Sequence, residues 1–182
     1  MSTLTWPIST PQLHSQELTL LPWKQAAELP NILEDLVSSC QDSAMQEFTQ
    51  VPHPYTPDMA RSFLADQQSV RWALKTKNRY CGSIELRLES LTNLTASLGY
   101  NTAPWARGQG LMKQALPLVI NHALSQGLYR IELHAATTNT ASRRVAEACG
   151  LTFEGIARGA EHLGSRIHDL ALYSALAGEK IG

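Results

Sequence analysis

The segment Y-N-T-A-P-W-A-R-G-Q-G-L-M, residues 100–112, contains the turn that decides the fold. Gly108 and Gly110 lie between an alternating strand pattern that ends near Tyr100 and a helical pattern that begins near residue 108. Glycine lets the backbone approach a ligand closely, and free N–H groups at a helix start favour a phosphate group. The segment is neither a P-loop, because no G-K-[ST] follows, nor a G-x-G-x-x-G dinucleotide motif. The glycines alone are equally typical of a plain tight turn.

The residues before this turn predict short strands and two helices. Thr56 and Pro57 are a typical N-cap and first helical residue. The alternating pattern of the later strands predicts an antiparallel meander with turns at residues 77–78 and 90–93. The first 14 or so residues of the chain are expected to form an irregular lead-in. The expected elements are a strand at 16–21, helices at 24–39 and 57–66, and strands at 70–75, 80–88 and 95–100.

The residues after the turn alternate between helix and strand patterns. A helix that joins two strands implies a parallel crossover. Pro117 falls inside the first of these helices, and we expect a kink there. The expected elements are helices at 108–126 and 140–149, and strands at 130–136, 151–157 and 167–174. We therefore predict one α/β domain over residues 1–182, with a mixed, partly antiparallel central sheet and helices on both faces.

Composition narrows the class of protein. The 182 residues are 43% hydrophobic and 17% charged, which fits one globular domain with a hydrophobic core. A net charge of -1 and a pI near 6.6 argue against direct nucleic-acid binding. We expect no membrane span and no signal peptide, and so a cytoplasmic protein. The cysteines (Cys40, Cys81, Cys149) and the six histidines lack ligand spacing, which predicts buried thiols and no metal site.

Three segments that follow strand ends are expected to meet at one edge of the sheet. They are residues 107–110, 137–142 and 158–165. In an open α/β sheet, ligands bind beyond the carboxyl ends of parallel strands, where loops and helix N-termini gather. We therefore expect the functional site at this edge.

The segment 100–112, the segment N-T-A-S-R-R-V-A-E-A-C-G-L at 139–151, and the strand–helix order around them resemble the GNAT superfamily of acetyl-CoA-dependent N-acetyltransferases. The pyrophosphate loop of that family, [Q/R]-x-x-G-x-[G/A], is matched by Arg107 and Gly110, while Met112 departs from it. The branch that the chain resembles most is that of the RimL/RimJ-like acetyltransferases of ribosomal-protein N-termini. The resemblance implies a GNAT-like fold and acetyl-CoA as the cofactor.

The resemblance also implies a cofactor site made mainly of backbone groups. The N–H groups of residues 107–112 would cradle the CoA pyrophosphate, and the strand end 100–102 would pair with the pantetheine arm. Asn139 matches a position that hydrogen-bonds the cofactor, although asparagine is also a good helix N-cap. The implied cofactor-binding residues are Tyr100, Asn101, Thr102, Arg107, Gly108, Gln109, Gly110, Leu111, Met112 and Asn139.

The catalytic groups follow from the same resemblance. Many GNAT members protonate the leaving thiolate with a tyrosine, and the matching position here is Ala146. The RimL-like pattern implies Ser142 as the acid and Glu161 as the base. Ser142 begins a helix and Glu161 follows a strand end, so both are expected at the same edge of the sheet. The alternative for Glu161 is an exposed carboxylate in a hairpin with no catalytic role. His162 and His168 are rival bases.

The final expected strand, residues 167–174, carries two more polar side chains. Asp169 and Tyr173 alternate onto one face of it, where we expect them to pack and to form hydrogen bonds.

The acceptor is expected to be the N-terminal α-amine of a ribosomal protein. An α-amine has a pKa near 8 and a lysine one near 10.4, and this gap of roughly 2.5 units corresponds to about 3.4 kcal/mol in favour of the neutral α-amine. Two alternatives remain open. They are acetylation of a small-molecule amine, such as an antibiotic, an aminoacyl-nucleotide or a polyamine, and a non-catalytic acyl-CoA-binding regulator. The resemblance is also compatible with a homodimer.

Overall fold

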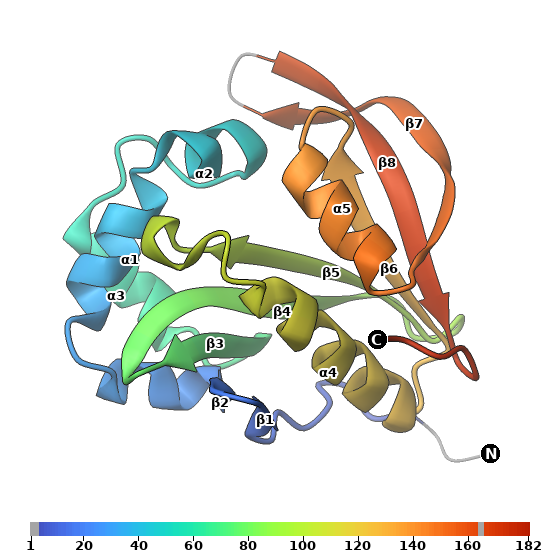
Figure 1. Ribbon diagram of the computed structural model, residues 1–182, viewed down its shortest axis with the longest axis horizontal. Helices are drawn as coiled ribbons and strands as arrows, with labels where there is room; N and C mark the ends of the chain where they lie inside the picture. Colours follow the sequence, from blue (N-terminus) through green and yellow to red (C-terminus); the bar gives the residue numbers. More distant parts are fainter. Residues whose placement is uncertain (1–3, 164–165) are drawn as a thin grey trace.

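The computed structural model describes residues 4–163 and 166–182 and shows an eight-stranded sheet with helices against both faces (Figure 1). The strand order is β1-β2-β3-β4-β5-β6-β8-β7, which confirms the predicted mixed α/β class. The elements are β1 (Leu13–Ser15), β2 (Leu18–Pro22), η1 (Trp23–Glu28), α1 (Ile32–Cys40), α2 (Ser43–Phe48), α3 (Pro57–Ala65), β3 (Val70–Thr76), β4 (Arg79–Ser90), β5 (Thr95–Thr102), η2 (Pro104–Ala106), α4 (Leu111–Ser125), β6 (Arg130–Ala136), α5 (Thr140–Ala148), β7 (Thr152–Leu163) and β8 (Arg166–Leu176).

Strands β3, β4 and β5 form the predicted antiparallel meander. The turn between β3 and β4 contains Lys77 and Asn78, with φ values of 44° and 62°. Two successive residues of positive φ are what a type I′ hairpin turn requires, and asparagine tolerates this conformation well. The meander is thus specified by local sequence as well as by its alternating apolar residues.

The helix predicted at residues 24–39 is wrong as a single element. The structure has the 3-10 helix η1 and then α1, with Pro30 and Asn31 between them. The residue before Pro30 is extended, as the proline ring requires, and Asn31 has a φ of 56°. These two conformations end one helix and start another.

Three short elements were not predicted, namely β1, α2 and the 3-10 helix η2. Helix α2 begins after Asp42, whose carboxylate accepts hydrogen bonds from the N–H groups of Ala44 and Met45 at 3.2 Å. Strand β1 lies within the predicted irregular lead-in, where Leu4 and Ile8 are buried in the core. Because these side chains pack under α4, the described part of the lead-in belongs to the folded domain.

The second half of the chain has the predicted parallel crossovers, but strand β8 lies between β6 and β7 in the sheet. β5 and β6 are parallel, and β8 pairs antiparallel with both β6 and β7. The strand predicted at 151–157 is too short, because β7 continues to Leu163 through residues that were expected in a loop. The helix predicted at 108–126 begins later, at Leu111, because Gly108 and Gly110 both adopt positive φ. Pro117 lies inside α4, and the kink there remains a prediction.

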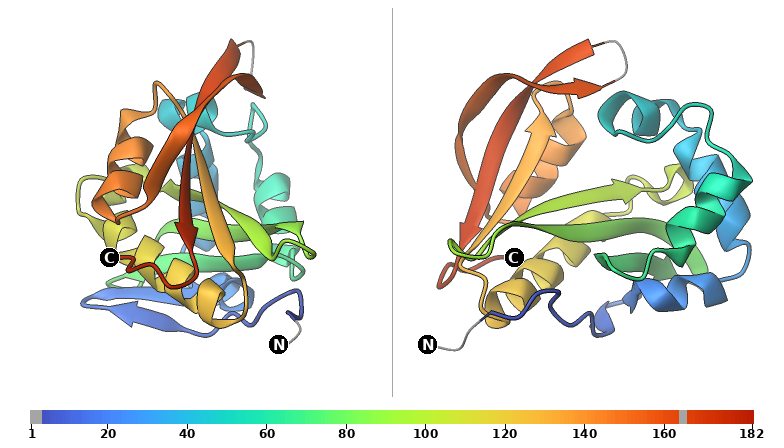
Figure 2. Two further views of the ribbon diagram at one scale, coloured as in Figure 1. Left: turned by 90° about the vertical axis from the view of Figure 1, so that its right-hand side faces the viewer. Right: turned by 180° about the vertical axis from the view of Figure 1, so that it is seen from behind.

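Two hydrophobic clusters are separated by the sheet. Figure 2 shows the backbone of the sheet and its helices from two further sides. The larger cluster lies between the sheet and helices α4 and α5 and includes the fully buried Trp72 and Ile84. The smaller lies between the meander and η1, α1 and α3. Cys40, Cys81 and Cys149 are buried free thiols, as predicted.

No helix in the described ranges is both long and apolar enough to cross a membrane.

Candidate active site

The sheet opens into a fork between β5 and β6. The two strands pair from Thr95 with Arg130 to Leu98 with Leu133. Beyond that point, in the part of the chain that the structure describes, β5 remains paired only with β4, and β6 only with β8. The predicted cofactor-binding residues Tyr100, Asn101 and Thr102 therefore lie where the β6 side of β5 has no strand partner within the described ranges. This edge offers backbone hydrogen-bonding groups to an extended ligand.

The loop before α4 provides a second opening suited to an anion. Gly108 and Gly110 have φ values of 74° and 70°, and a Cβ atom at either would meet nothing within 4 Å. The first N–H of α4 to reach a helical carbonyl is that of Gln114, which donates to Gly110. Within the described ranges the N–H groups of residues 111–113 have no backbone acceptor and are available to a phosphate, and the open glycines let it approach closely.

The other predicted residues of this loop have different roles. Leu111 and Met112 bury their side chains in the core, so only their backbone can face a ligand. The Gln109 side chain donates to the carbonyl of Trp105 at 3.0 Å. Arg107 pairs with the carboxylate of Asp42 at 2.5 Å, and this hydrogen bond is the main reason that the pKa of Asp42 is lowered. Arg107 thereby joins the loop to the start of α2.

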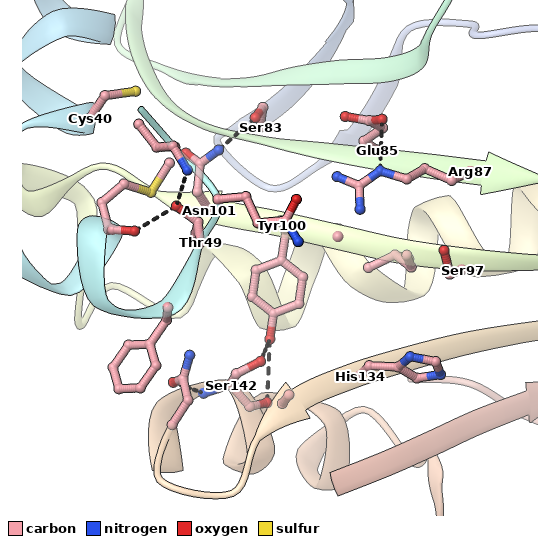
Figure 3. A pocket seen from close by; sticks show the side chains of 18 of the residues that line it. Cys40, Thr49, Ser83, Glu85, Arg87, Ser97, Tyr100, Asn101, His134 and Ser142 are labelled. Carbon is pink, nitrogen blue, oxygen red and sulfur yellow. Dashed lines mark hydrogen bonds and ion pairs between the residues drawn. The ribbon is translucent and has the colours of Figure 1, made fainter. Parts of the chain in front are cut away.

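Asn139 and Ser142 form the start of α5 on the β6 side of the fork. The Asn139 side chain accepts a hydrogen bond from the Ser142 N–H at 3.1 Å, so its expected N-cap role is confirmed. The hydroxyl of Ser142 lies 2.9 Å from the hydroxyl of Tyr100, which reaches across from β5 (Figure 3). Ala146 is buried and carries no phenol, as the sequence indicated.

Glu161 lies in strand β7, and its expected position just beyond the strand end is wrong. Ala157 pairs with Leu170 and Glu161 with His168, so residues 158–160 of β7 oppose the single residue Asp169 of β8. This bulge adds two residues, an even number, and therefore leaves Glu161 on the same face as Ala157. That face is the one on which Leu170 lines the pocket.

The bulge is held by one carboxylate. Asp169 accepts a hydrogen bond from the Gly159 N–H at 2.7 Å through Oδ1, and its backbone carbonyl accepts one from the Thr137 N–H at 2.9 Å. Gly159 has a φ of 59°, which glycine adopts without strain. Asp169 thus connects the strand that carries Glu161 to the loop before α5, and its expected hydrogen-bonding role is confirmed.

The surroundings of Glu161 differ from those of His162 and His168, the two other candidate bases. Its carboxylate accepts a hydrogen bond from the Gln50 side chain at 3.3 Å. His162 is exposed and pairs with the exposed Ile167 on the opposite face of the hairpin. His168 is 9% exposed and packs its ring against Phe48, with centroids 6.5 Å apart. Only Glu161 of these three side chains lines the pocket.

One pocket of about 620 Å³ joins these groups. It is lined by the fork residues of β5 and β6, by Asn139 and Ser142, by Glu161, and by residues 48–52 after α2. The structure therefore brings Ser142 and Glu161 to one cavity, as expected. The loop 107–112 does not line this cavity and lies at the start of α4.

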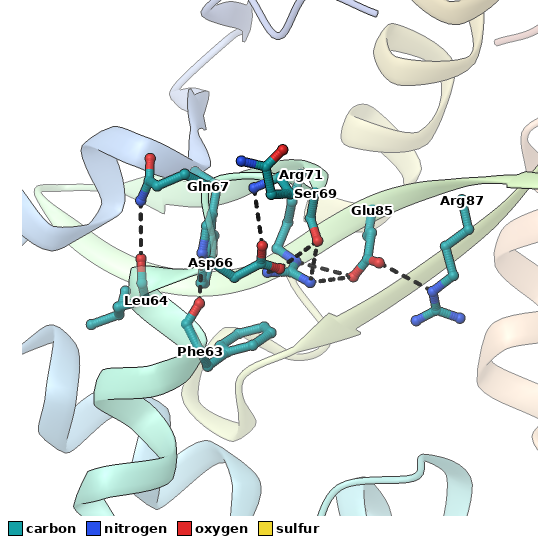
Figure 4. A network of polar contacts seen from close by, with 10 residues as sticks. Phe63, Leu64, Asp66, Gln67, Ser69, Arg71, Glu85 and Arg87 are labelled. Atoms are coloured by element: carbon teal, nitrogen blue, oxygen red, sulfur yellow. Dashed lines mark hydrogen bonds and ion pairs between the residues drawn. The ribbon is translucent and has the colours of Figure 1, made fainter. Parts of the chain in front are cut away.

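A buried ion network forms the floor of the pocket on the meander side (Figure 4). Arg71 is 5% exposed and donates to Glu85 at 2.7 Å and to Asp66 at 3.4 Å. Its guanidinium carbon also lies 4.2 Å from the ring centroid of Phe63. Glu85 accepts a further hydrogen bond from the exposed Arg87 at 3.1 Å. Every charge of this floor has a partner, which favours a fixed surface under the acceptor side of the pocket.

Sequence reasoning missed three side chains of this region. The Asp42 N-cap could have been found, since Asp before a short helix is a typical start. The phenol of Tyr100 and the amide of Gln50 act through partners 42 and 111 residues away in sequence, and local patterns do not report such contacts.

Comparisons with known proteins agree with this geometry. The family model for the GNAT acetyltransferase domain matches residues 17–152. YdaF of Bacillus subtilis (strain 168), provisionally named a ribosomal N-acetyltransferase, is 33% identical over 124 residues, 68% of this chain and 67% of YdaF. The ribosomal-protein-serine acetyltransferase of Escherichia coli (strain K12) is 35% identical over 91 residues, half of each chain.

Among solved structures, RimL, a ribosomal alpha-N-protein acetyltransferase in complex with coenzyme A, superposes with a TM-score of 0.76 at 21% identity. The match covers 89% of this chain and 95% of RimL. At this level of identity the likeness concerns the fold. The family match over most of the chain is decisive for membership: the protein belongs to the GNAT acetyltransferases, enzymes that use acetyl-CoA.

Proposed function

We propose that this acetyltransferase modifies the N-terminal α-amine of a ribosomal protein, with Glu161 as the base and Ser142 as the acid. The observation that carries the proposal is the single pocket at the fork, which both side chains line. The names of the two relatives, which share 33% and 35% identity with the chain, support the acceptor class. Ribosomal proteins are made in the cytoplasm, which would be the site of action.

The openings described above fit acetyl-CoA. The free N–H groups at the start of α4 would bind the pyrophosphate, and the unpaired edge of residues 100–102 would bind the pantetheine arm. When bound there, acetyl-CoA supplies an acetyl group activated as a thioester. The Arg107 side chain is held by Asp42 and its backbone N–H donates to the Pro104 carbonyl at 3.5 Å, so Arg107 would act mainly by positioning the loop.

Glu161 is suited to accept a proton from the attacking amine. Its carboxylate faces the pocket from β7, and among the described residues only the neutral Gln50 amide donates to it. An α-amine needs little help to lose its proton near pH 8, so a carboxylate acting directly or through one water suffices. Ser142 faces the same pocket from the other wall and can donate its hydroxyl proton to the leaving sulfur.

The shape of the pocket favours a chain terminus as the acceptor. Its walls are the segment after α2 on one side and the β7–β8 hairpin on the other, and the polar floor of β4 and β5 runs between them. A groove of this kind can hold the first residues of an extended peptide while its amine reaches the fork.

The test measures thiol release from acetyl-CoA with a panel of acceptors. The panel contains peptides with N-terminal Ser or Ala, the same peptides with a blocked α-amine and an internal lysine, aminonucleotides, aminoglycosides and polyamines. We expect turnover with the free N-terminal peptides and at least about 100-fold less with the blocked ones, in line with the difference in amine pKa. Turnover confined to small amines, or CoA binding without any turnover, would contradict the proposal.

A further inference from the structure

The side chain of Tyr100 reaches the proposed acid from the opposite wall of the fork. Its hydroxyl lies 2.9 Å from Ser142 Oγ and 3.3 Å from the backbone carbonyl oxygen of the same residue. Tyr100 pairs with Ile84 in the β4–β5 ladder, so its ring leaves the sheet on the side of the larger core. Figure 3 shows the phenol pointing from β5 to Ser142.

The surroundings of this phenol favour a donor role over a base role. Burial, the largest influence, raises the pKa of Tyr100 to about 12, although the hydrogen bond with Ser142 lowers it. The hydroxyl therefore keeps its proton at any pH at which the enzyme would work. A protonated phenol has one hydrogen, which can go either to Ser142 Oγ or to the carbonyl of Ser142.

These two arrangements have different consequences for Ser142. When the phenol donates to Oγ, the serine hydrogen is free to point into the pocket. When the phenol donates to the carbonyl, the serine hydroxyl can donate back to the phenol oxygen and is unavailable. The backbone of Ser142 is fixed independently, because Asn139 accepts its N–H. The choice therefore concerns the hydroxyl alone.

The phenol also compensates for a residue that α5 lacks. Ala146 lies four residues after Ser142, on the same side of the helix, and offers no hydroxyl. Tyr100 brings a phenol to the same helix from the neighbouring strand β5.

We propose that Tyr100 is a positioning residue that donates its hydrogen bond to Ser142 Oγ and so directs the Ser142 hydrogen toward the leaving sulfur. The proposal rests on the role of Ser142 proposed above. In the step concerned, the neutral amine nitrogen bonds to the thioester carbonyl carbon and gives one proton to Glu161, the C–S bond breaks with its electron pair on sulfur, and sulfur takes the proton of Ser142. The phenol keeps the serine oxygen hydrogen-bonded while its negative charge develops, until solvent returns a proton to it.

A double-mutant cycle on kcat tests this coupling with the variants Tyr100→Phe, Ser142→Ala and the two combined. We expect Tyr100→Phe to lower kcat about 10-fold, with an unchanged KM for acetyl-CoA, because the hydrogen bond acts on the transition state. In the Ser142→Ala background the same change should lower kcat by less than about 2-fold, since two residues that act as one unit are not additive. Ser142→Ala leaves the phenol its backbone acceptor, so its packing is maintained.

Tyr173→Phe is the matched control. Tyr173 is buried, and its phenol also bonds α5, through Glu147 at 2.9 Å and Arg143 at 3.1 Å, but it does not line the pocket. We expect this variant to change kcat by less than about 2-fold, and a comparison of melting temperatures should show that the two phenylalanine variants are equally folded.

The possible outcomes are distinct. An equal loss from Tyr100→Phe in both backgrounds would mean that Tyr100 acts independently of Ser142 and would overturn the inference. No loss from Tyr100→Phe, with a slow Ser142→Ala enzyme, would overturn it and leave Ser142 as the acid. A Ser142→Ala enzyme with full kcat would remove Ser142 from the mechanism and the inference with it, whereas N-terminal acetylation would stand or fall by the acceptor panel.

Discussion

The meander β3–β5 and the hairpin β7–β8 lie on opposite sides of the fork and are built differently. In the meander the register shifts only near the turns, and its central residues are buried. In the hairpin the register shifts twice within β7, and most of β7 is exposed. The regular half thus provides a fixed floor, and the irregular half carries Glu161 just beyond a bulge, on the face that lines the pocket.

The candidate chemistry is divided in the same way. Glu161 belongs to the hairpin and Ser142 to α5 on the same side of the fork, while Tyr100 is the meander residue that reaches across to Ser142. We therefore expect substitutions in the hairpin to lower turnover and substitutions in the meander floor to lower stability.

The largest effect is expected from Glu161→Gln, which keeps the shape of the side chain and removes its basicity. Loss of a positioned general base costs roughly 10² to 10⁴ in rate, so kcat should fall by at least about 100-fold while the Kd for acetyl-CoA is unchanged. Steady-state kinetics and calorimetric binding measure the two quantities. The control is His162→Gln, one residue away on the outer face, and a wild-type rate for Glu161→Gln would exclude this base.

The second largest effect is expected on the free energy of unfolding, from the ion network around Arg71 that forms the floor of the pocket. Arg71→Met leaves the carboxylates of Glu85 and Asp66 without their buried partner. Breaking a buried ion pair on one side costs about 3 to 5 kcal/mol, which urea unfolding should detect. Arg87→Met, which removes an exposed partner of Glu85, should cost less than about 1 kcal/mol. Equal losses for the two variants would mean that the network does not depend on Arg71.

The third effect tests the bulge. Asp169→Ala removes the acceptor for the Gly159 N–H, so Glu161 should lose its fixed direction. We expect kcat to fall about 10-fold, corresponding to about 1.4 kcal/mol, with little change in the Kd for acetyl-CoA. Asp169→Asn retains an oxygen at the same position and should recover most of the rate. If both variants had wild-type kcat, the bulge would have no part in positioning the base.

The smallest effect is a pH dependence of stability far from the pocket. Hydrogen bonds from Arg130 and then from Ser174 hold the pKa of Glu154 at about 2, below the usual 4.5. A lowered pKa in the folded state stabilises the fold above about pH 4.5, and this contribution is lost as the pH falls toward 2. Because the Glu154 side chain is 35% exposed, we expect its contribution to the free energy of unfolding to be under about 1 kcal/mol. Acid unfolding of Glu154→Gln should be less steep in this range; an unchanged curve would contradict the assignment.

The same contrast explains how much could be predicted from the sequence. The meander, its turn at Lys77 and Asn78, the Thr56 and Asn139 caps and the parallel β5–β6 step follow from local rules, and all were confirmed. The turn and the caps depend on neighbours within a few residues, and the parallel step follows from the helix that joins its two strands. The turn pattern and the family resemblance also led to the edge where Ser142 and Glu161 meet.

The remaining features depend on contacts that are distant in sequence. The bulge that extends β7 past Ala157 depends on Asp169 in the next strand, and the Asp42 contact with Arg107 joins residues 65 positions apart. The break at Pro30 and Asn31 was missed because an apolar helical pattern runs through it. The phenol of Tyr100 reaches Ser142 only because the sheet forks between β5 and β6.

The most direct test of the account is the position of the acetyl group on a peptide that offers both kinds of amine. A peptide with a free N-terminal serine and an internal lysine is incubated with the enzyme and acetyl-CoA, and tandem mass spectrometry locates the added group. We predict acetylation of the α-amine, its loss in Glu161→Gln and no modification of the lysine. Acetyl groups on the lysine, or equal labelling by Glu161→Gln, would contradict this prediction.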